Sequence, residues 1–322
     1  MNPFERAARA VDRFQQRHTV VAFPIAVFKK FGDDEGGRLA ALIAYYGFFS
    51  VFPLLLVFTS VLGFVLGAHP DLREDIIDTA FAQFPVIGRS VADRADVDTL
   101  EGNWPSIVVG GVTALWAGLG VAQAAQTAMN TVWGIPRANW PNFLLRRVRA
   151  LGMLLLLGTI VILSTFTSGF GASGAPDHWL FVAASWVLAV LLNLALFMLT
   201  YQILTARALT WRNVLPGALV AALAWTALQA VGGYFVTNQL RDASDVYGTF
   251  ALVIALLVWI GLGAQVALLC AEVNVVLNQR LWPRSLVQPP LTEGDRRVYT
   301  AIVERERMRP EQTVDVTFRE EH

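Results

Sequence analysis

The sequence predicts an all-α integral membrane protein, a bundle of six transmembrane helices with the N and C termini in the cytoplasm. Three observations support this fold class. The chain has 322 residues, of which 55% are hydrophobic and 16% charged, and its mean hydropathy of +0.50 is too high for an ordinary soluble domain. Apolar segments of membrane-spanning length recur along it, and the positively charged residues concentrate in alternate connectors.

The predicted spans are six mostly apolar segments, each of about 20 residues or more, the length that an α-helix needs to cross the hydrocarbon core of a bilayer. None of them contains Lys or Arg, and Glu272 is the only acidic residue in any of them. The spans cover residues 39–67, 104–134, 151–170, 179–205, 214–237 and 248–278. Because the number of crossings is even, both termini are expected on the same side of the membrane.

The charge distribution gives the orientation of the bundle. Of the 25 Lys and Arg residues, 21 lie in the two terminal segments and the connectors on the same side as the termini, and 4 lie in the connectors of the opposite side. Connectors rich in Lys and Arg remain in the cytoplasm. Both termini are therefore predicted to be cytoplasmic.

Residues 1–38 form a predicted cytoplasmic or interfacial segment. Phe4, Val11 and Phe14 recur at close to helical spacing with arginines between them, which predicts an interfacial helix on anionic lipid. The apolar run at residues 20–28 is too short to span a membrane, contains a proline and ends at two lysines. It is expected to form an in-plane or re-entrant element.

The remaining domain boundaries follow from composition. Residues 39–278 form the predicted six-helix transmembrane domain. Its longest connector, residues 68–103, contains 8 acidic residues and apolar residues at helical spacing, so we expect an outer-loop cap of short helices there. Residues 279–322 combine prolines with mixed charges and are predicted to form a partly disordered cytoplasmic tail.

Polar side chains within the spans are the candidate functional residues, because each is costly in lipid and normally faces the bundle interior, a partner or a cavity. They could form a polar pathway in which Glu272 titrates, or interhelical hydrogen bonds worth about 0.6 kcal/mol each. Glu272 lies near the end of its span, where it could also reach water or pair with Arg280. The candidates are Gln123, Gln126, Asn130, Tyr201, Gln229, Gln265, Glu272 and Asn274.

Enzyme chemistry has little support in the sequence. The four histidines lie in separate connectors or tails, so no close pair is available to bind a metal. No serine-nucleophile elbow or phosphate-binding loop motif occurs. We therefore expect no catalytic residues, no metal and no cofactor, and the zero net charge gives no reason to expect a nucleic-acid partner.

Several motifs resemble the YihY/BrkB family of bacterial inner-membrane proteins over nearly the whole region of the spans. The first span has the Ala-x-x-x-Ala-Tyr-Tyr and Ser-x-Phe-Pro patterns, and the fifth has Pro-Gly-Ala. A Tyr-Gly pair lies at the start of the sixth span, at residues 247–248, and this span carries Glu-x-Asn at residues 272–274. The principal motif residues are Tyr45, Tyr46, Pro53, Pro216, Gly217, Tyr247 and Gly248.

This resemblance implies a multi-pass protein of the bacterial cytoplasmic membrane with an envelope-related role. The first hypothesis is transport or accommodation of a lipid-like or amphipathic envelope component, with membrane lipids as partners. The alternative is a structural or assembly partner of envelope machinery that binds envelope or cytoplasmic proteins. The family was long labelled ribonuclease BN, but tRNA processing would need a basic RNA-binding surface and a metal or acid–base constellation, which the sequence does not indicate.

Overall fold

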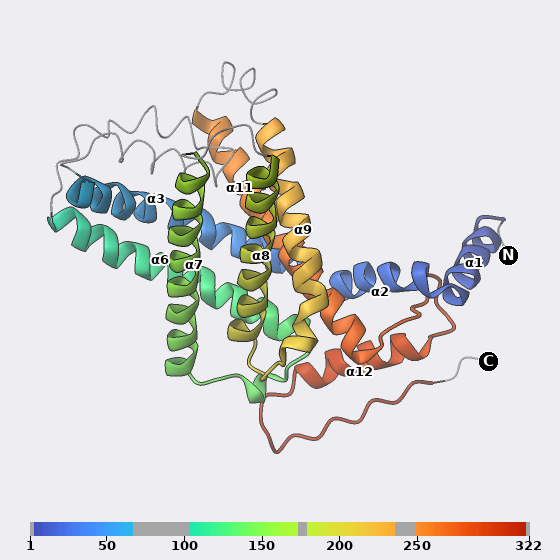
Figure 1. Ribbon diagram of the computed structural model, residues 1–322. Coiled ribbons are helices and arrows are strands. Elements are labelled where there is room, and N and C mark those ends of the chain that lie inside the picture. Colours follow the sequence, from blue (N-terminus) through green and yellow to red (C-terminus); the bar gives the residue numbers. More distant parts are fainter. Residues whose placement is uncertain (1–2, 67–103, 173–178, 236–248, 320–322) are drawn as a thin grey trace.

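The computed structural model describes residues 3–66, 104–172, 179–235 and 249–319 (Figure 1). Within these ranges every regular element is helical, which confirms the all-α class. The predicted outer-loop cap at residues 68–103 lies outside the described residues. The helices are α1 (Pro3–Arg17), α2 (Thr19–Asp33), α3 (Gly36–Leu66), α6 (Trp104–Val132), α7 (Phe143–Ala172), α8 (Trp179–Leu204), α9 (Trp211–Phe235), α11 (Thr249–Gln279) and α12 (Glu293–Arg305), with a short 3-10 helix at Arg137–Asn139.

A long helix occupies each of the six predicted apolar segments. These helices, α3, α6, α7, α8, α9 and α11, are 25 to 31 residues long. Within the described residues, three windows are long and apolar enough to cross a membrane, at Val108–Val132, Val187–Leu204 and Val253–Gln279. Helix α7 begins at Phe143, before the predicted start at residue 151, because the arginines that bounded the predicted span do not interrupt a helix.

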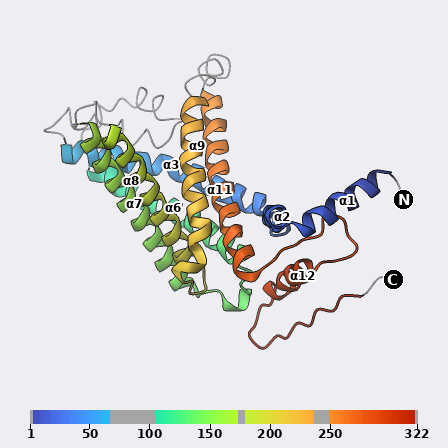
Figure 2. The same cartoon turned by 45° about the vertical axis from the view of Figure 1, so that its right-hand side comes forward.

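The long helices form two groups that cross each other (Figures 1 and 2). Helices α7, α8, α9 and α11 run in roughly the same direction, whereas α3 and α6 pair with each other and pass across them. Helix α11 is central because it contacts α2, α3, α6 and α9. Helices α1, α2 and α12 lie together on one side, and with the last turns of α11 they form what we call the charged end.

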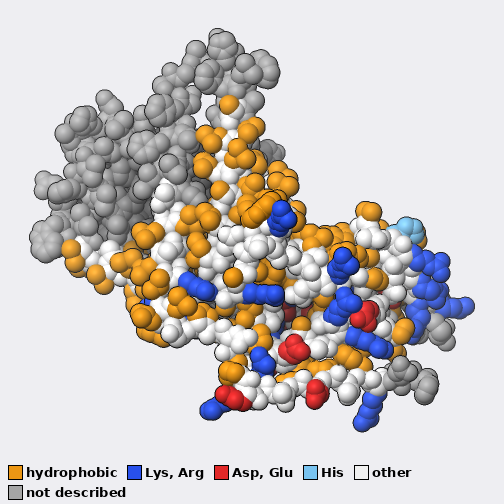
Figure 3. Space-filling view, turned by 60° about the horizontal axis from the view of Figure 1, so that its bottom comes forward, with side chains coloured by type: hydrophobic (Ala, Val, Ile, Leu, Met, Phe, Trp, Pro, Cys, Tyr) orange, Lys and Arg blue, Asp and Glu red, His pale blue; other side chains and the backbone are white. Residues whose placement is uncertain are grey.

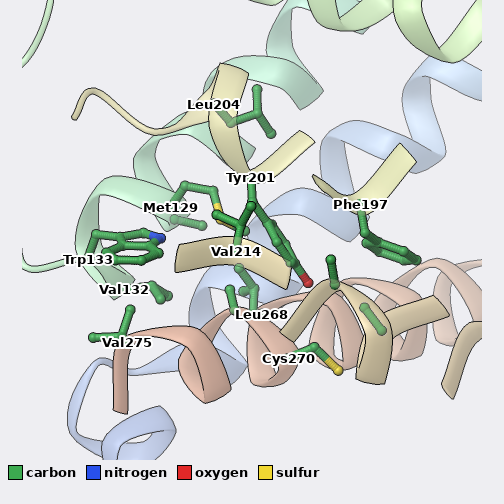
Figure 4. Close-up of a cluster of buried hydrophobic side chains, with 14 of the residues drawn as sticks. Met129, Val132, Trp133, Phe197, Tyr201, Leu204, Val214, Leu268, Cys270 and Val275 are labelled. Atoms are coloured by element: carbon green, nitrogen blue, oxygen red, sulfur yellow. The ribbon is translucent and has the colours of Figure 1, made fainter. Parts of the chain in front are cut away.

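Side chains from four helices form the apolar core beside the charged end (Figure 4). Trp133 follows α6, Tyr201 belongs to α8, Val214 to α9 and Leu268 to α11, and all four are buried. The crossing of α9 and α11 is close because Gly217 has no side chain. A Cβ atom at Gly217 would lie 2.2 Å from the backbone oxygen of Cys270.

Two predicted segments have more helix than expected. The sequence suggested that this element ends at Lys29 and Lys30, but helix α2 continues through both lysines to Asp33. It continues because Lys30 is buried against carboxylates instead of marking a boundary with water. The tail contains α12, which begins with a capping box formed by Thr292 and Asp295.

Candidate functional site

A buried ion pair joins α2 to α11 at the charged end. Glu272 on α11 has no solvent exposure, and its Oε2 atom lies 3.2 Å from Nζ of Lys30 on α2. Lys30 also pairs with Asp34 and donates a hydrogen bond of 2.9 Å to the backbone oxygen of Val132 at the end of α6. The lysine therefore connects three segments of the chain.

The sequence of α2 places this lysine inside. Ala26, Val27 and Lys30 lie on one helical face and are buried, and Asp34 follows Lys30 by four residues. A buried charge is tolerated only when it is paired. Burial alone would lower the pKa of Lys30, but the negative charges of Glu272 and Asp34 raise it above its usual value, so the lysine stays protonated.

The C-terminal segment completes this network. Nη1 of Arg305 on α12 lies 2.8 Å from Oδ1 of Asp34, so two carboxylates and two cations alternate across α2, α11 and α12. Beside them is a pocket of about 10 Å³, room for roughly one water molecule, lined in part by Lys30, Asp34 and Arg305. Among the described residues, neither oxygen of Glu272 accepts a hydrogen bond of good geometry.

A second ion-pair cluster lies next to the first. Nε of Arg284 lies 2.6 Å from Oδ1 of Asp295 on α12, and its Nη2 lies 2.7 Å from Oδ2 of Asp33. Lys29 reaches Asp295 at 3.0 Å. Burial alone would raise the pKa of Asp295, but hydrogen bonds from Arg284, the Ser285 amide, Thr292 and Lys29 lower it to about 2. The only two lysines in the sequence therefore belong to different clusters, Lys30 to the first and Lys29 to the second.

Helix α1 is held against the same C-terminal segment. Asp12 is buried and its Oδ1 accepts a hydrogen bond of 2.9 Å from the Leu286 amide. Gln15 is also buried and donates a bond of 2.6 Å to the backbone oxygen of Arg284. Burial would raise the pKa of Asp12, but the backbone amide of Leu286 and the other donors lower it. The polar face of α1 is therefore its packed face.

Several of the predicted polar residues bond to the backbone of another segment. The side chain of Gln126 donates a hydrogen bond of 3.0 Å to the Arg146 backbone oxygen, and the side chain of Asn130 accepts one of 2.8 Å from the Ala206 amide. The hydroxyl of Tyr201 donates a hydrogen bond of 2.8 Å to the Ala267 backbone oxygen, and the side chain of Asn274 accepts one of 2.6 Å from the Gly217 amide. These bonds join α6 to α7 and to the segment after α8, α8 to α11, and α9 to α11.

The other predicted residues are dispersed. Gln265 is exposed on α11 whereas Glu272 is buried, so the two do not line a common cavity within the described residues. Gln123 and Gln229 are half-buried. Arg280, the suggested partner of Glu272, is exposed, and Lys30 takes its place.

The family-motif residues are also spread over the fold. Tyr45 and Tyr46 are exposed on α3, and their rings meet edge to face. Pro53 and Pro216 are half-buried within α3 and α9, and Gly217 is buried at the crossing of α9 and α11. The two remaining motif residues, at positions 247 and 248, lie outside the described residues.

Sequence reasoning missed most of the charged end. Asp34, Arg284, Asp295 and Arg305 lie in a connector and in the tail, and none of them was predicted to be functional. One available signal was the adjacent lysine pair with two aspartates four residues later, a spacing that places opposite charges on one helical face. The capping-box pattern at residues 292–295 was another, because it marks the start of a helix.

The chain is similar to known membrane proteins. The family described as "Virulence factor BrkB" matches residues 27–292. A "Putative ribonuclease-like protein YfkH" from Bacillus subtilis is 22% identical, over 81% of this chain and 96% of its own length. A "UPF0761 membrane protein" from Azotobacter vinelandii is 31% identical, over 80% of this chain and 64% of its own length. The "Inner membrane protein YhjD" of Escherichia coli is 22% identical, over 80% of this chain and 81% of its own length.

No solved structure matches the chain significantly. The family match covers most of the residues and includes all the long helices described above. Relatives are named as membrane or inner-membrane proteins, and the described helices include three that can cross a membrane. The resemblance to the YihY/BrkB family and the membrane location are confirmed: the chain belongs to the BrkB family and is a protein of the bacterial inner membrane.

Proposed function

We propose that this protein binds a lipid-like or amphipathic component of the cell envelope within the membrane and carries it between the two leaflets. The observation that supports this proposal most directly is the position of Gln265. Its side chain is exposed in the middle of α11, inside the membrane-length window Val253–Gln279. A polar side chain facing only lipid tails is costly, so its exposure favours contact with a polar group of a ligand.

The surroundings of Gln265 suit an amphipathic ligand. Ile254, Val258 and Leu262 precede it at intervals of four, four and three residues, so they lie on the same side of α11, and all three are exposed. Glu272 lies two helical turns further along this side, about 10 Å away, where α2 covers the helix. Acyl chains would lie along the apolar residues and the polar group would lie at Gln265.

We further propose that the six long helices all cross the membrane and that the charged end faces the cytoplasm. The distribution of Lys and Arg in the sequence supports this orientation. In Figure 3, Lys and Arg side chains gather toward the side of the molecule that carries α1 and α12. Gln265 would then lie within the membrane and Glu272 near its cytoplasmic side.

Reconstitution into liposomes tests the proposed function. Lipids with a fluorescent headgroup are placed in both leaflets, and a membrane-impermeant reductant then bleaches the outer leaflet. We expect wild-type protein to expose the inner pool and Gln265→Leu to reduce the rate at least tenfold. Leu191→Met, a conservative change at an exposed position of α8 away from this face, is the matched control and should retain the wild-type rate. Bleaching no faster than in protein-free vesicles would contradict the proposal.

We do not propose a nuclease function, although the Bacillus subtilis relative is named ribonuclease-like. The carboxylates of the charged end are engaged by cations: Glu272 and Asp34 by Lys30, and Asp295 by Arg284. Carboxylates held in this way are poorly placed to activate water or to bind a metal. Incubation of purified protein with tRNA and divalent metal ions provides the test, and protein-dependent trimming would overturn this position.

A further inference from the structure

Helix α1 packs on the protein with its polar side. Asp12 and Gln15 are buried against residues 284–287 and bond to their backbone. Arg9 reaches the same segment through a bond of 3.1 Å to the Pro289 oxygen. In a soluble protein an amphipathic helix normally buries its apolar face, so α1 has the reverse orientation.

The side of α1 next to the packed one is apolar and exposed. Val11 and Phe14 each have a relative exposure of 58%, and Ala10 beside them is also exposed. At the start of α2, Val20 is 86% exposed. No described part of the protein covers these side chains, so an apolar medium outside the protein is needed to bury them.

Three arginines lie along one edge of this apolar side. Arg6, Arg13 and Arg17 follow the spacing i, i+7, i+11, which places them on one helical face about 60–100° from Phe14, and all are exposed. Figure 3 shows Lys and Arg side chains at the right-hand edge, where α1 lies. An apolar strip with a row of arginines beside it fits the boundary between acyl chains and anionic headgroups.

The position of α1 in the fold agrees with such a boundary. Helices α1 and α2 extend sideways from the bundle: α2 lies across the direction of α7, α8 and α9, and α1 continues outward from it at an incline (Figures 1 and 2). A helix that lies across the spanning helices can rest in the plane of a membrane surface. Nucleic acid would match the arginines but would leave Val11, Phe14 and Val20 in water.

We propose that α1 is an anionic-lipid-binding surface that the C-terminal segment 284–289 holds in a fixed orientation. Val11, Phe14 and Val20 enter the acyl-chain boundary, and Arg6, Arg13 and Arg17 bind the phosphates of anionic lipids. Because Asp12 and Gln15 are bonded to the C-terminal segment, lipid contact at α1 is linked to the position of that segment. This surface is separate from Gln265 and does not depend on the proposed transport.

The test uses the full chain in lipid nanodiscs. An environment-sensitive fluorophore is attached at Ala10→Cys in a Cys270→Ala background, and a second protein carries the label at Glu311→Cys in the exposed tail as a control. Discs of phosphatidylcholine are compared with discs that also contain phosphatidylglycerol. We expect phosphatidylglycerol to shift the emission of the Ala10 label to the blue and to shield it from aqueous iodide, with no change at Glu311.

Charge-removing variants separate the proposal from general adsorption. Each arginine near an anionic surface contributes about 1 kcal/mol, so each change to Gln should raise the phosphatidylglycerol content needed for half-maximal shielding about fivefold in effective concentration. Arg6→Gln, Arg13→Gln and Arg17→Gln leave the contacts of Asp12 intact, and exchange of the Leu286 amide reports that α1 stays docked. The proposal would be overturned if the Ala10 label showed the same emission and the same iodide quenching in both lipids, or if it responded to free phosphate or RNA in place of lipid.

Discussion

Nζ of Lys30 lies 3.2 Å from Oε2 of Glu272, and both side chains are buried. Lys30 lies on α2, which precedes all the long helices, and Glu272 lies near the end of α11, the last of them. The pair therefore joins the two ends of the helical domain.

Glu272→Gln should destabilise the protein, because removing one partner of a buried ion pair leaves an incompletely compensated charge, at a cost of about 3–5 kcal/mol. Asp34 still faces Lys30, so we expect the lower part of this range. The double variant Lys30→Met, Glu272→Gln should lose less than the sum of the single variants. Unfolding by denaturant in detergent micelles measures all three, and additive losses would mean that the pair is not coupled.

Acid should loosen the C-terminal segment in a defined range. The pKa of Asp295 is lowered from 3.8 to about 2 in the folded protein, so its contribution to stability is complete above about pH 4 and is lost as the pH falls from there through 2. Fluorescence of the half-buried Trp282 reports on this segment. Asp295→Asn should show the loosened signal already at neutral pH, and an unchanged acid transition in this variant would assign the transition to another group.

Gly217→Ala should disturb the crossing of α9 and α11. The added Cβ would lie 2.2 Å from the Cys270 oxygen and 2.5 Å from Nδ2 of Asn274, so the helices must separate, at a cost of at least about 1–3 kcal/mol. Gly152→Ala is the matched control because nothing lies within 4 Å of its Cβ position. Alanine favours a helix interior over glycine by about 1 kcal/mol, so the control should be neutral or stabilising. Thermal unfolding in detergent distinguishes the two.

Removing residues 281–322 should release α1 and α2. The deletion takes away Arg284, Asp295 and Arg305, and with them the partners of Asp33 and Lys29 and one of the partners of Asp34. We expect faster tryptic cleavage after Arg17 and Lys29 in the truncated protein. Removing residues 313–322 alone leaves α12 and both ion-pair clusters in place, so its cleavage rate should match that of the complete chain.

The sequence allowed the long helices to be predicted because continuous apolar runs specify membrane-length helices without reference to tertiary contacts. Their ends were less certain, as α7 shows, since its arginines are compatible with helix. The charged end could not be predicted in the same way. Lys30 and Glu272 are far apart in the chain, and only the crossing of α2 with α11 brings them together.

The candidate polar residues show the same limit. Intramembrane position identified Gln126 and Asn130 as residues that need partners, but their acceptor and donor, the Arg146 oxygen and the Ala206 amide, are backbone groups that no side-chain pattern reveals. For Gln265 the sequence suggested the same helical face as Glu272. It could not show that α2 covers one residue and leaves the other exposed.

The burial of Lys30 also constrains the order in which the protein assembles. During synthesis α2 emerges before any of the long helices, at a stage when Asp34 is available to its lysine but the carboxylate of Glu272 is not. Helix α2 therefore lacks one of the two carboxylates that pair with Lys30 while the rest of the bundle is made. It can take up its final position only after α11 has been made, so correct closure of the charged end reports that synthesis of the helical domain is complete.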